Sequence, residues 1–561
     1  MTFEQMQRNA IAECEALEDS ETPRIYIGTA TCGRSSGALE VLDHLKAELD
    51  QRNIDARVIE VGCIGCCYLE PLVYIAKRGR PRLAYSNVTP EIDSQLITDY
   101  IVNDNPRPDL AICSIGEGEV EDIPNLLELP MFKPQLRIAL RDCGYIDPGN
   151  INHYIASSGY SGLARALGMT PKEVIEEISQ SGLKGGGGAG FPTGTKWRFC
   201  QDAPGSEKYL ICNAAEGDPA VYKDRLLLES DPHSVLEGML IGAYAIRATR
   251  GYIYIPAEYT LAVDRLKTAL KQMEDNELLG DNILGANFSF NIEVKEEARA
   301  FVCGEETALI CSLEGKRAMP YPRPPFPTTS GLRGKPTVVN NVETWANVSA
   351  ILQKGAEWYA GYGTEQSKGT KILALAGKVK RPGLIEVPMG ITLRQIVYDI
   401  GGGIPDGKDF KAVLIGGPTG GCLPESALDL AIDYEHLIEH GAIMGSGSMI
   451  VTDSDTCMID LAKCCLSFTQ AESCGKCVLC REGTVQMLEF LTDITEGRGK
   501  PKDIDLLLEL SEGIKLGSLC ALGGTAPNPV QTTIRYFRDE YEAHVKRKQC
   551  PAKVCKGLIS S

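Results

Sequence analysis

Residues 182–197 constrain this chain more than any other stretch, because they read GLKGGGGAGFPTGTKW. Four consecutive glycines place no side chains between the backbone and a ligand, so their amide N–H groups can converge on one anion. A flexible glycine linker is the simpler alternative. Linkers, however, rarely end with an aromatic residue and a cation, as this stretch does at Phe191 and Lys196. We therefore interpret it as a phosphate-binding loop.

Two familiar phosphate loops do not fit this stretch. Gly185, Gly187 and Gly190 satisfy G-x-G-x-x-G, but a Rossmann fingerprint requires a strand before the loop and a helix directly after it. Residues 170–179 instead predict a capped amphipathic helix, and residues 191–194 are expected to interrupt any helix that would begin there. A Walker A loop is excluded, because no Gly-Lys-Ser/Thr follows at the required spacing.

Length and composition narrow the class of protein. A chain of 561 residues suggests several domains, and its net charge of -18 without a basic stripe argues against nucleic-acid binding. No apolar run approaches the roughly 18 to 20 residues that span a bilayer, and the N-terminus lacks the features of a signal peptide. We therefore expect a cytoplasmic protein without a membrane span. Its 21 cysteines favour metal or cluster ligation over a disulfide framework.

The N-terminal residues predict a small α/β domain. After an amphipathic helix within residues 1–20, a strand at 24–29, a helix at 36–46 and a strand at 56–61 are expected. Two further short strands are expected at 72–76 and 82–88. This order, with cysteines at strand ends, resembles the thioredoxin-like 2Fe-2S domain of the small flavoprotein-partner subunit of respiratory complex I. We assign this domain to residues 1–104.

The ligand pattern of that family is C-x4-C followed by C-x3-C, and this chain matches it in part. Cys63 and Cys67 fit the second pair and Cys32 fits one member of the first, but Ile27 stands where the remaining ligand is expected. Cys66 is a candidate substitute. A 2Fe-2S cluster needs four ligands, so a cluster and a degenerate domain that serves only for docking both stay open.

Residues 105–147 are rich in proline and charge and are expected to link domains, and residues 148–365 form the next globular unit. Within it, residues 209–213 predict a buried strand that ends in a polar cluster, a usual place for ligand-contacting groups. Residues 300–309 predict a second strand-to-helix turn, which carries Glu305 and Glu306. Adjacent carboxylates at a helix start can also serve only the helix dipole.

Five motifs of this unit occur together. They read FPTGTKW at 191–197, CNAAE at 212–216, CGEETAL at 303–309, PPFP at 324–327 and NNVET at 340–344. The combination resembles the FMN- and NADH-binding subunit of complex I, a protein of the 51 kDa type. It is closer still to the diaphorase subunits of NAD-linked hydrogenases, formate dehydrogenases and electron-bifurcating complexes, which carry a fused thioredoxin-like domain.

The resemblance implies roles for individual residues. The FMN would be held by Gly185, Gly187, Gly188, Lys196, Asn213, Gly304, Asn340 and Asn341, with its ring near Glu216 and Glu305, which would act by positioning rather than as bases. The nicotinamide dinucleotide site would be shaped by Phe191, Phe199, Asp218, Glu306, Arg323 and Phe326.

Three positions depart from the family pattern. Gly186 replaces an arginine in the loop, Ala215 replaces an aspartate near the flavin, and Arg299 replaces a small residue shortly before Cys303. These changes redistribute charge around the flavin and the dinucleotide. A shifted flavin potential, an altered choice between NAD and NADP, and a weakened NADH site are all compatible with them.

The remaining residues predict a scaffold domain and an iron-sulfur cluster that accepts electrons from the flavin. Residues 366–440 resemble the ubiquitin-like (SLBB) domain of the same family, and residues 441–545 are expected to be helical. The C-x2-C-x2-C run of Cys474, Cys477 and Cys480 suits three corners of a 4Fe-4S cubane, and Cys520 matches the family's fourth ligand. Zinc, the alternative, usually prefers two Cys or Cys/His pairs.

A second metal site is suggested by the C-terminal tail, residues 546–561. Cys550 and Cys555, with the nearby His544 and the distant Cys457, suit zinc and match a Cys/His tail in related hydrogenase-type subunits. A frayed tail with two free thiols is the alternative.

We therefore predict a multidomain α/β and α+β protein with a thioredoxin-like domain, a Rossmann-like FMN/NAD domain, a ubiquitin-like domain and a C-terminal helical bundle. The resemblance implies a diaphorase subunit that passes a hydride between NAD(P)H and FMN and single electrons through the 4Fe-4S cluster. Electron bifurcation is compatible with it. Expected partners are a ferredoxin-like iron-sulfur subunit and a small 2Fe-2S subunit of a hydrogenase, formate dehydrogenase or similar complex. The rival hypothesis is a non-catalytic electron conduit or scaffold.

Overall fold

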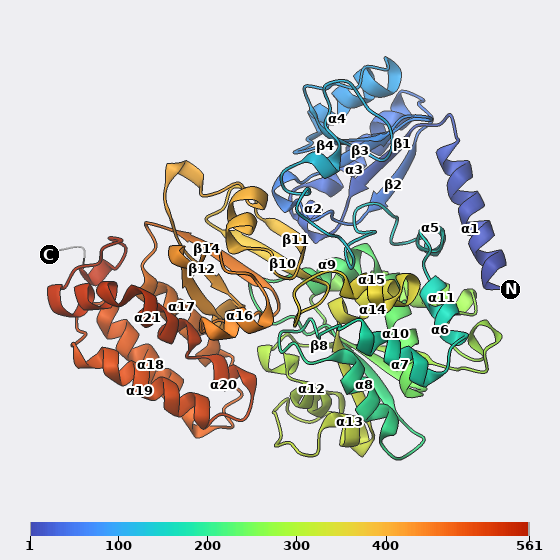
Figure 1. Ribbon diagram of the computed structural model, residues 1–561. Helices are drawn as coiled ribbons and strands as arrows, with labels where there is room; N and C mark the ends of the chain where they lie inside the picture. Colours follow the sequence, from blue (N-terminus) through green and yellow to red (C-terminus); the bar gives the residue numbers. More distant parts are fainter. Residues whose placement is uncertain (1, 559–561) are drawn as a thin grey trace.

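The computed structural model describes residues 2–558, which form three β-sheets from successive parts of the chain and a C-terminal helical unit (Figure 1). In Figure 1 the N-terminal unit lies at the upper right, above the second unit, and the C-terminal helices lie at the left. No helix among the described residues is long and apolar enough to cross a bilayer.

The N-terminal unit is a mixed five-stranded sheet of order β2-β1-β3-β4-β5. Its strands are β1 (Arg24–Gly28), β2 (Arg57–Val61), β3 (Val73–Ala76), β4 (Arg82–Tyr85) and β5 (Ala111–Ile115). Its helices are α1 (Phe3–Glu18), α2 (Thr31–Ser35), α3 (Ala38–Gln51) and α4 (Pro90–Leu96). The apolar residues of α3 recur at helical spacing and are buried, so one face of the helix packs on the sheet. The strands expected at 24–29, 56–61, 72–76 and 82–88 are thereby confirmed.

The segment 105–147, expected as a linker, contributes to this unit. Its strand β5 pairs antiparallel with β4, so the N-terminal sheet extends beyond residue 104. Proline and charge flank this short strand, and they concealed it in the sequence.

The second unit contains a fully parallel sheet of order β8-β7-β6-β9. Its strands are β6 (Tyr209–Asn213), β7 (Arg250–Pro256), β8 (Asn291–Glu297) and β9 (Thr337–Asn341). The helices of this unit are α5 (Ile151–Ala156), α6 (Ser161–Leu167), α7 (Pro171–Gln180), α8 (Thr193–Asp202), α9 (Lys223–Ser230), α10 (Pro232–Ile246), α11 (Thr260–Asp275), α12 (Glu306–Leu313), α13 (Pro327–Ser330), α14 (Val342–Lys354) and α15 (Ala356–Ala360). The strand expected at 209–213 and the helix expected at 170–179 are confirmed.

Two local expectations in this unit are wrong. A helix, α8, does begin directly after the glycine loop, because Pro192 occupies the N-cap position, where its missing N–H costs nothing. Residues 301–304 form a 3-10 helix rather than a strand. The sheet has already ended at Glu297, and Glu472 of the C-terminal unit accepts a hydrogen bond from the backbone N–H of Phe301.

The third sheet has the order β11-β10-β14-β12-β13. Its strands are β10 (Thr370–Gly377), β11 (Gly383–Pro388), β12 (Phe410–Ile415), β13 (Gly421–Pro424) and β14 (Ser448–Asp453), and α16 (Tyr434–Glu439) packs nearby. Strand β14 lies beyond residue 440, so this unit extends past the expected boundary. The C-terminal unit consists of α17 (Met458–Ala471), α18 (Val478–Thr495), α19 (Lys502–Leu516), α20 (Ala521–Thr525) and α21 (Asn528–Glu542).

A buried carboxylate joins the third sheet to the segment that precedes the second unit. Glu386 of β11 accepts hydrogen bonds from the backbone N–H groups of Ile138, Ala139 and Leu140 at 2.9, 3.0 and 2.9 Å. These groups are buried, so no water can replace the acceptor easily. Glu386 therefore fixes the path of residues 136–140 between the first and second units.

Replacing Glu386 with alanine should destabilise the protein substantially. Three buried donors would lose their acceptor, at a cost of about 1 to 3 kcal/mol for an unsatisfied group. We expect a lower thermal melting midpoint and faster proteolysis within residues 105–147. Glu425→Ala, at an exposed position directly after β13 of the same sheet, is the control, and equal melting of the two variants would contradict the assignment.

Candidate functional site

The candidate site lies at the carboxyl ends of β6 and β9. Strands β7 and β8 continue the sheet on one side of β6, whereas β9 lies on its other side. In open parallel sheets ligands bind at such a switch point, beyond the carboxyl ends of the strands. Asn213 and Asn341 end the two strands and face each other in register.

The glycine loop passes over the start of α14 and leaves backbone donors free. The N–H of Gly185 donates to the carbonyl of Phe191 at 2.9 Å, and that of Gly186 donates to Thr344 Oγ1 at 3.0 Å. The N–H groups of Gly187 and Gly188, by contrast, donate to no acceptor within residues 2–558. Free amides that converge beside a helix N-terminus suit a phosphate, so the loop fits the anionic end of FMN.

Side chains from α8 and β6 enclose the same region. Lys196 Nζ donates to the carbonyl of Val339 at 3.0 Å, and Trp197 Nε1 donates to Asn340 Oδ1 at 3.0 Å. Asn213 Nδ2 donates to the carbonyl of Gly304 at 3.0 Å and so holds the 301–304 turn at the end of β6. The predicted FMN residues are therefore brought together from four separate segments.

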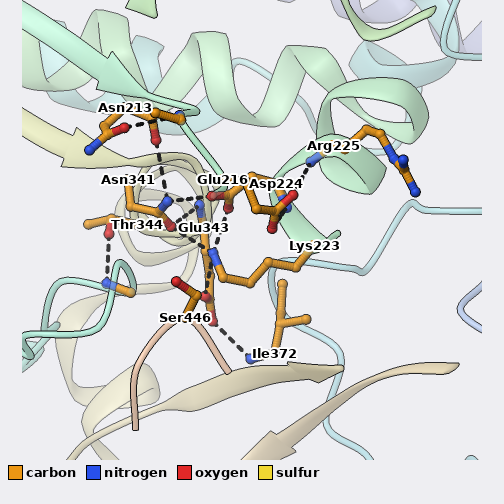
Figure 2. Close-up of polar contacts among 12 residues, drawn as sticks. Asn213, Glu216, Lys223, Asp224, Arg225, Asn341, Glu343, Thr344, Ile372 and Ser446 are labelled. Carbon is orange, nitrogen blue, oxygen red and sulfur yellow. Dashed lines mark hydrogen bonds and ion pairs between the residues drawn. The ribbon is translucent and has the colours of Figure 1, made fainter. Parts of the chain in front are cut away.

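Lys223, Asp224, Glu343 and Lys371 form a buried ion network. Figure 2 shows Lys223, Asp224 and Glu343 of this network beside Asn341. Lys223 Nζ contacts Asp224 Oδ1 at 2.5 Å and Glu343 Oε2 at 3.2 Å, and it donates to Asn341 Oδ1 at 2.9 Å. Lys371 of β10 pairs with the same Glu343 at 2.5 Å. Burial alone raises the pKa of Glu343, but Lys371 and Lys223 outweigh it, so that the pKa is lowered and the carboxylate stays ionised.

Sequence reasoning missed this network. Lys223 and Asp224 closely follow the polar cluster at 214–218, and Lys371 is a charged residue in an otherwise apolar strand. The charged Lys371 in a strand predicted to be buried could have indicated the network, since lysine is rarely buried without a partner.

The two predicted acidic residues after β6 are buried and have defined partners. Glu216 accepts hydrogen bonds from the backbone N–H groups of Asp224 and Arg225 at 3.0 and 3.4 Å. Burial, followed by the charge of Asp224, raises the pKa of Glu216 to about 7. Asp218 contacts the turn at Gly417, where any Cβ would lie 1.9 Å from Asp218 Oδ2, and burial raises its pKa to about 6.

Three of the predicted dinucleotide residues are exposed aromatic rings, and two others, Glu306 and Arg323, form an ion pair beside one of these rings. Phe191, Phe199 and Phe326 are 44, 54 and 53% exposed. The Arg323 guanidinium pairs with Glu306 at 2.9 Å and lies 5.7 Å from the ring centroid of Phe326. Exposed aromatic faces of this kind suit the stacking of a planar ligand.

Glu305 behaves differently from its neighbour Glu306. Its carboxylate caps α12 by accepting hydrogen bonds from the backbone N–H groups of Thr307 and Ala308, each at 2.9 Å. The side chain of Glu305 therefore serves the start of α12, as the helix-dipole interpretation expects. Its backbone follows Gly304 in the turn beside the candidate flavin site.

The four cysteines predicted to hold the 4Fe-4S cluster converge at the near end of the helical unit. Cys477 is the N-cap of α18, Cys480 lies in its first turn, and Cys520 is the N-cap of α20. Burial and then the charge of neighbouring thiols, Cys474 among them, raise the pKa of Cys480 and of Cys520. Two helix N-termini thus present thiols to one space, which fits an anionic cluster.

Hydrogen bonds connect this cysteine loop to the flavin side. Glu472, two residues before Cys474, accepts from the backbone N–H of Phe301 at 2.9 Å. Arg317 donates to the carbonyl of Cys474 at 3.3 Å. The 301–304 turn is therefore held by Asn213 at one end and by the cysteine loop at the other.

Two further groups of thiols are compact. Ligand atoms of Cys457, His544, Cys550 and Cys555 all lie within 4.8 Å of one another and are buried, as a tetrahedral zinc site requires. The thiols of Cys32, Cys63 and Cys67 are equally close.

Cys66 does not join the second of these groups. Its thiol contacts Met131 Sδ at 3.5 Å in a different part of the core, so the expectation that it replaces the missing ligand is wrong.

Fold and site together define an oxidoreductase subunit that binds a flavin nucleotide and an iron-sulfur cluster. Family models support this class: residues 178–350 match the Nuo51 FMN-binding domain, residues 460–544 match the NADH-ubiquinone oxidoreductase-F iron-sulfur binding region, and residues 372–422 match the SLBB domain.

Known proteins extend the comparison. The chain is 57% identical over 428 residues to the NADP-reducing hydrogenase subunit HndC of Solidesulfovibrio fructosivorans, covering 76% of this chain and 87% of that protein. It is 43% identical over 437 residues to an NADH-quinone oxidoreductase subunit of Escherichia coli, covering 77% and 98%. A solved NAD+-reducing [NiFe]-hydrogenase in the H2-reduced state matches with a TM-score of 0.65 at 28% identity, covering 97% of this chain and 88% of that one.

The chain belongs to the family of 51 kDa-type flavoprotein subunits. It is an NADH dehydrogenase-type oxidoreductase subunit, in which electrons pass from a nicotinamide dinucleotide to FMN and on to a 4Fe-4S cluster. Its relatives are subunits of multi-subunit redox complexes, and this chain is expected to work in one.

The raised pKa of Glu216 gives a testable titration. A carboxyl whose pKa is raised by folding contributes its full stabilisation when the pH is below its pKa in the unfolded chain, 4.5. This contribution is lost as the pH rises through its folded pKa of about 7. Buried Asp218 also contributes protonated-carboxyl absorbance in this pH range. In flavin-free protein we therefore expect a protonated-carboxyl infrared band that disappears near neutral pH and that the difference spectrum of wild type minus Glu216→Gln isolates. The band should remain in Glu305→Gln. A wild-type spectrum without change between about pH 5 and pH 8 would contradict the assignment.

Proposed function

We propose that this chain is the diaphorase subunit of a hydrogenase, formate dehydrogenase or similar complex. The observation that supports it best is the 301–304 turn, which is held by Asn213 at the switch point and by Glu472 beside the cysteine loop. When bound, FMN exchanges two electrons with NAD(P)H and one electron at a time with the cluster. A turn shared by both proposed sites would bring the two cofactors close to each other.

The proposal assigns the FMN to the site at β6 and β9. The free amides of Gly187 and Gly188, supported by Gly185, would bind its phosphate, and Lys196, Asn213, Gly304, Asn340 and Asn341 would hold the remainder. Glu216 would lie buried near the ring, and Glu305 would position the Gly304 turn through its cap on α12.

The dinucleotide would bind at the exposed aromatic group beside this site. Phe191, Phe199 and Phe326 supply faces for stacking, and Glu306 and Arg323 supply opposite charges at their edge. Asp218, buried against Gly417, would form the wall of the pocket.

The flanking units would serve assembly. We propose a thioredoxin-like N-terminal domain, a Rossmann-like flavin domain and a ubiquitin-like SLBB scaffold, with a ferredoxin-like iron-sulfur subunit and a small 2Fe-2S subunit as partners. The proposed location is the cytoplasm, since all 21 cysteines are free and disulfides are rare in reducing compartments.

Reduction of the bound flavin tests the proposal. Anaerobic addition of NADH, and separately of NADPH, should bleach the flavin absorbance of the purified protein and identify its dinucleotide. Asn213→Ala should weaken FMN binding by up to about tenfold, because a hydrogen bond contributes about 0.5 to 1.5 kcal/mol. Asn276→Ala, on the far end of α11, is the control. Bound flavin that neither dinucleotide reduces would support the non-catalytic conduit instead.

We also propose that Cys457, His544, Cys550 and Cys555 hold one structural zinc ion. His544 Nε2 lies 3.5 Å from the sulfur atoms of both Cys457 and Cys555, which are 3.7 Å apart. Donors at these separations match a tetrahedral site with Zn–S bonds of about 2.3 Å.

Metal analysis should find about one zinc per chain. His544→Ala should lose it and lower the melting midpoint of the helical unit, because metal binding there is part of folding. His440 is partly buried and contacts none of these cysteines, and it provides the control variant His440→Ala. Wild-type protein without zinc, and with unchanged melting in a chelator, would favour the free-thiol tail.

A further inference from the structure

We propose that Glu70 supplies the fourth ligand of the N-terminal metal centre, beside Cys32, Cys63 and Cys67. Of the two possibilities that the sequence leaves open for the N-terminal domain, this inference takes the 2Fe-2S cluster, and it rests on the proposed thioredoxin-like domain. The three thiols lie within 4.8 Å of one another. Such a cluster needs four ligands, and the family pattern offers no fourth thiol here.

Glu70 is buried next to the three thiols. Only 6% of the residue is exposed, and its Oε1 lies 3.8 Å from Cys32 Sγ. Its Oε2 accepts a hydrogen bond from the backbone N–H of Leu72 at 3.0 Å, which fixes the orientation of the carboxylate. No cation forms an ion pair with Glu70 within residues 2–558. A buried carboxylate without a cation is costly, and a metal ion would remove that cost.

Two glycines make room for this carboxylate. A Cβ at Gly28 would lie 3.1 Å from Glu70 Oε2, and a Cβ at Gly33 would lie 3.1 Å from the same oxygen and 2.1 Å from the carbonyl oxygen of Gly28. Larger residues at either position would press on Glu70. The chain therefore keeps a space at the start of α2 that is shaped for a carboxylate beside Cys32.

The position of the missing thiol cannot serve instead. Ile27 is fully buried in the apolar cluster beneath α3, together with Val41, Leu42 and Val73. The thiols of Cys32, Cys63 and Cys67 pack against a different cluster, which belongs to the second unit. The fourth donor has thus moved from β1 to the segment after Cys67, three residues further along the chain.

The three cysteines and Glu70 would supply the same ligand charge as four cysteines. Binding would remove one proton from each of three thiols, and the carboxylate would add a fourth negative charge. The total ligand charge therefore equals that of four thiolates. Carboxylate oxygen is a harder donor than sulfur, so the iron that it binds should differ in its spectrum from a thiolate-ligated iron.

Residues of the second unit close the pocket. Cys67 Sγ lies 3.2 Å from Tyr222 Oη, and the backbone N–H of Cys63 donates to Ser230 Oγ at 3.1 Å. Glu229 accepts from the backbone N–H of Thr31 at 2.8 Å. A metal centre here would be sheltered from water and would face α9, whose first residue belongs to the ion network.

The test uses the full-length protein and counts its metal. Wild-type protein should contain about six iron atoms, four in the 4Fe-4S cluster and two in the N-terminal one. Glu70→Ala should lose about two iron and two sulfide, whereas Glu70→Cys should keep them and show shifted g values in the electron paramagnetic resonance spectrum of the reduced cluster. Glu229→Gln, a buried glutamate of the same interface that contacts none of these thiols, should keep both iron atoms and the wild-type spectrum.

The outcomes separate this inference from the proposed cluster. Full iron content and an unchanged spectrum in Glu70→Ala would overturn the ligand role, and so would a Glu70→Cys spectrum identical to wild type. Wild-type protein could instead contain about four iron atoms and one zinc ion in addition to the tail zinc. If Glu70→Ala lost that zinc ion, Glu70 would still be a ligand, but the cluster would be refuted. Wild-type protein with no metal at these thiols would overturn both.

Discussion

The position of the flavin site depends on the buried ion network around Glu343. Lys223 and Lys371 pair with this one carboxylate, and Lys223 also holds Asp224 and Asn341. Because removing one partner of a buried ion group leaves an uncompensated charge, the network links its members strongly. Lys371 belongs to the third sheet, whereas Glu343 lies in the first turn of α14, directly after β9. The asparagines at the switch point are therefore fixed in part by Lys371, a residue of the third sheet, acting through Glu343 and Lys223.

Features built from residues close together in the sequence could be predicted, whereas contacts between residues far apart in the sequence could not. Strand β6, the glycine loop and the Cys474–Cys480 run are local patterns, and the sequence alone was enough to find them. Lys223 and Glu343 lie about 120 positions apart, so no local pattern could pair them. Glu70 was missed for another reason, since the family pattern contains only thiols. The helix after the glycine loop was missed because proline usually interrupts a helix, whereas Pro192 stands at the N-cap, where proline is tolerated.

The proposed metal sites of the chain differ in where they lie. The tail set is compact and lies within the core of the helical unit, where a metal would hold the chain end. The cysteines of the 4Fe-4S site lie at helix N-termini beside the 301–304 turn, close to the flavin side. The N-terminal thiols touch the second unit through Tyr222, the residue before Lys223. Two of the three sites thus contact segments that also build the flavin site, whereas the tail set does not.

The structure indicates that the three departures from the family pattern, at Gly186, Ala215 and Arg299, change the charge around the site only slightly. A Cβ at Gly186 would lie 2.9 Å from Glu343 Oε2, so an arginine there would approach a carboxylate that Lys223 and Lys371 already neutralise. Ala215 removes one negative charge from the family pattern, so the net charge of the two positions together is unchanged. Arg299 pairs with Glu258 at 3.2 Å and is 37% exposed, so solvent and its partner screen its charge. The local charge is therefore nearly balanced, and this balance favours a working dinucleotide site over a conduit that has lost it.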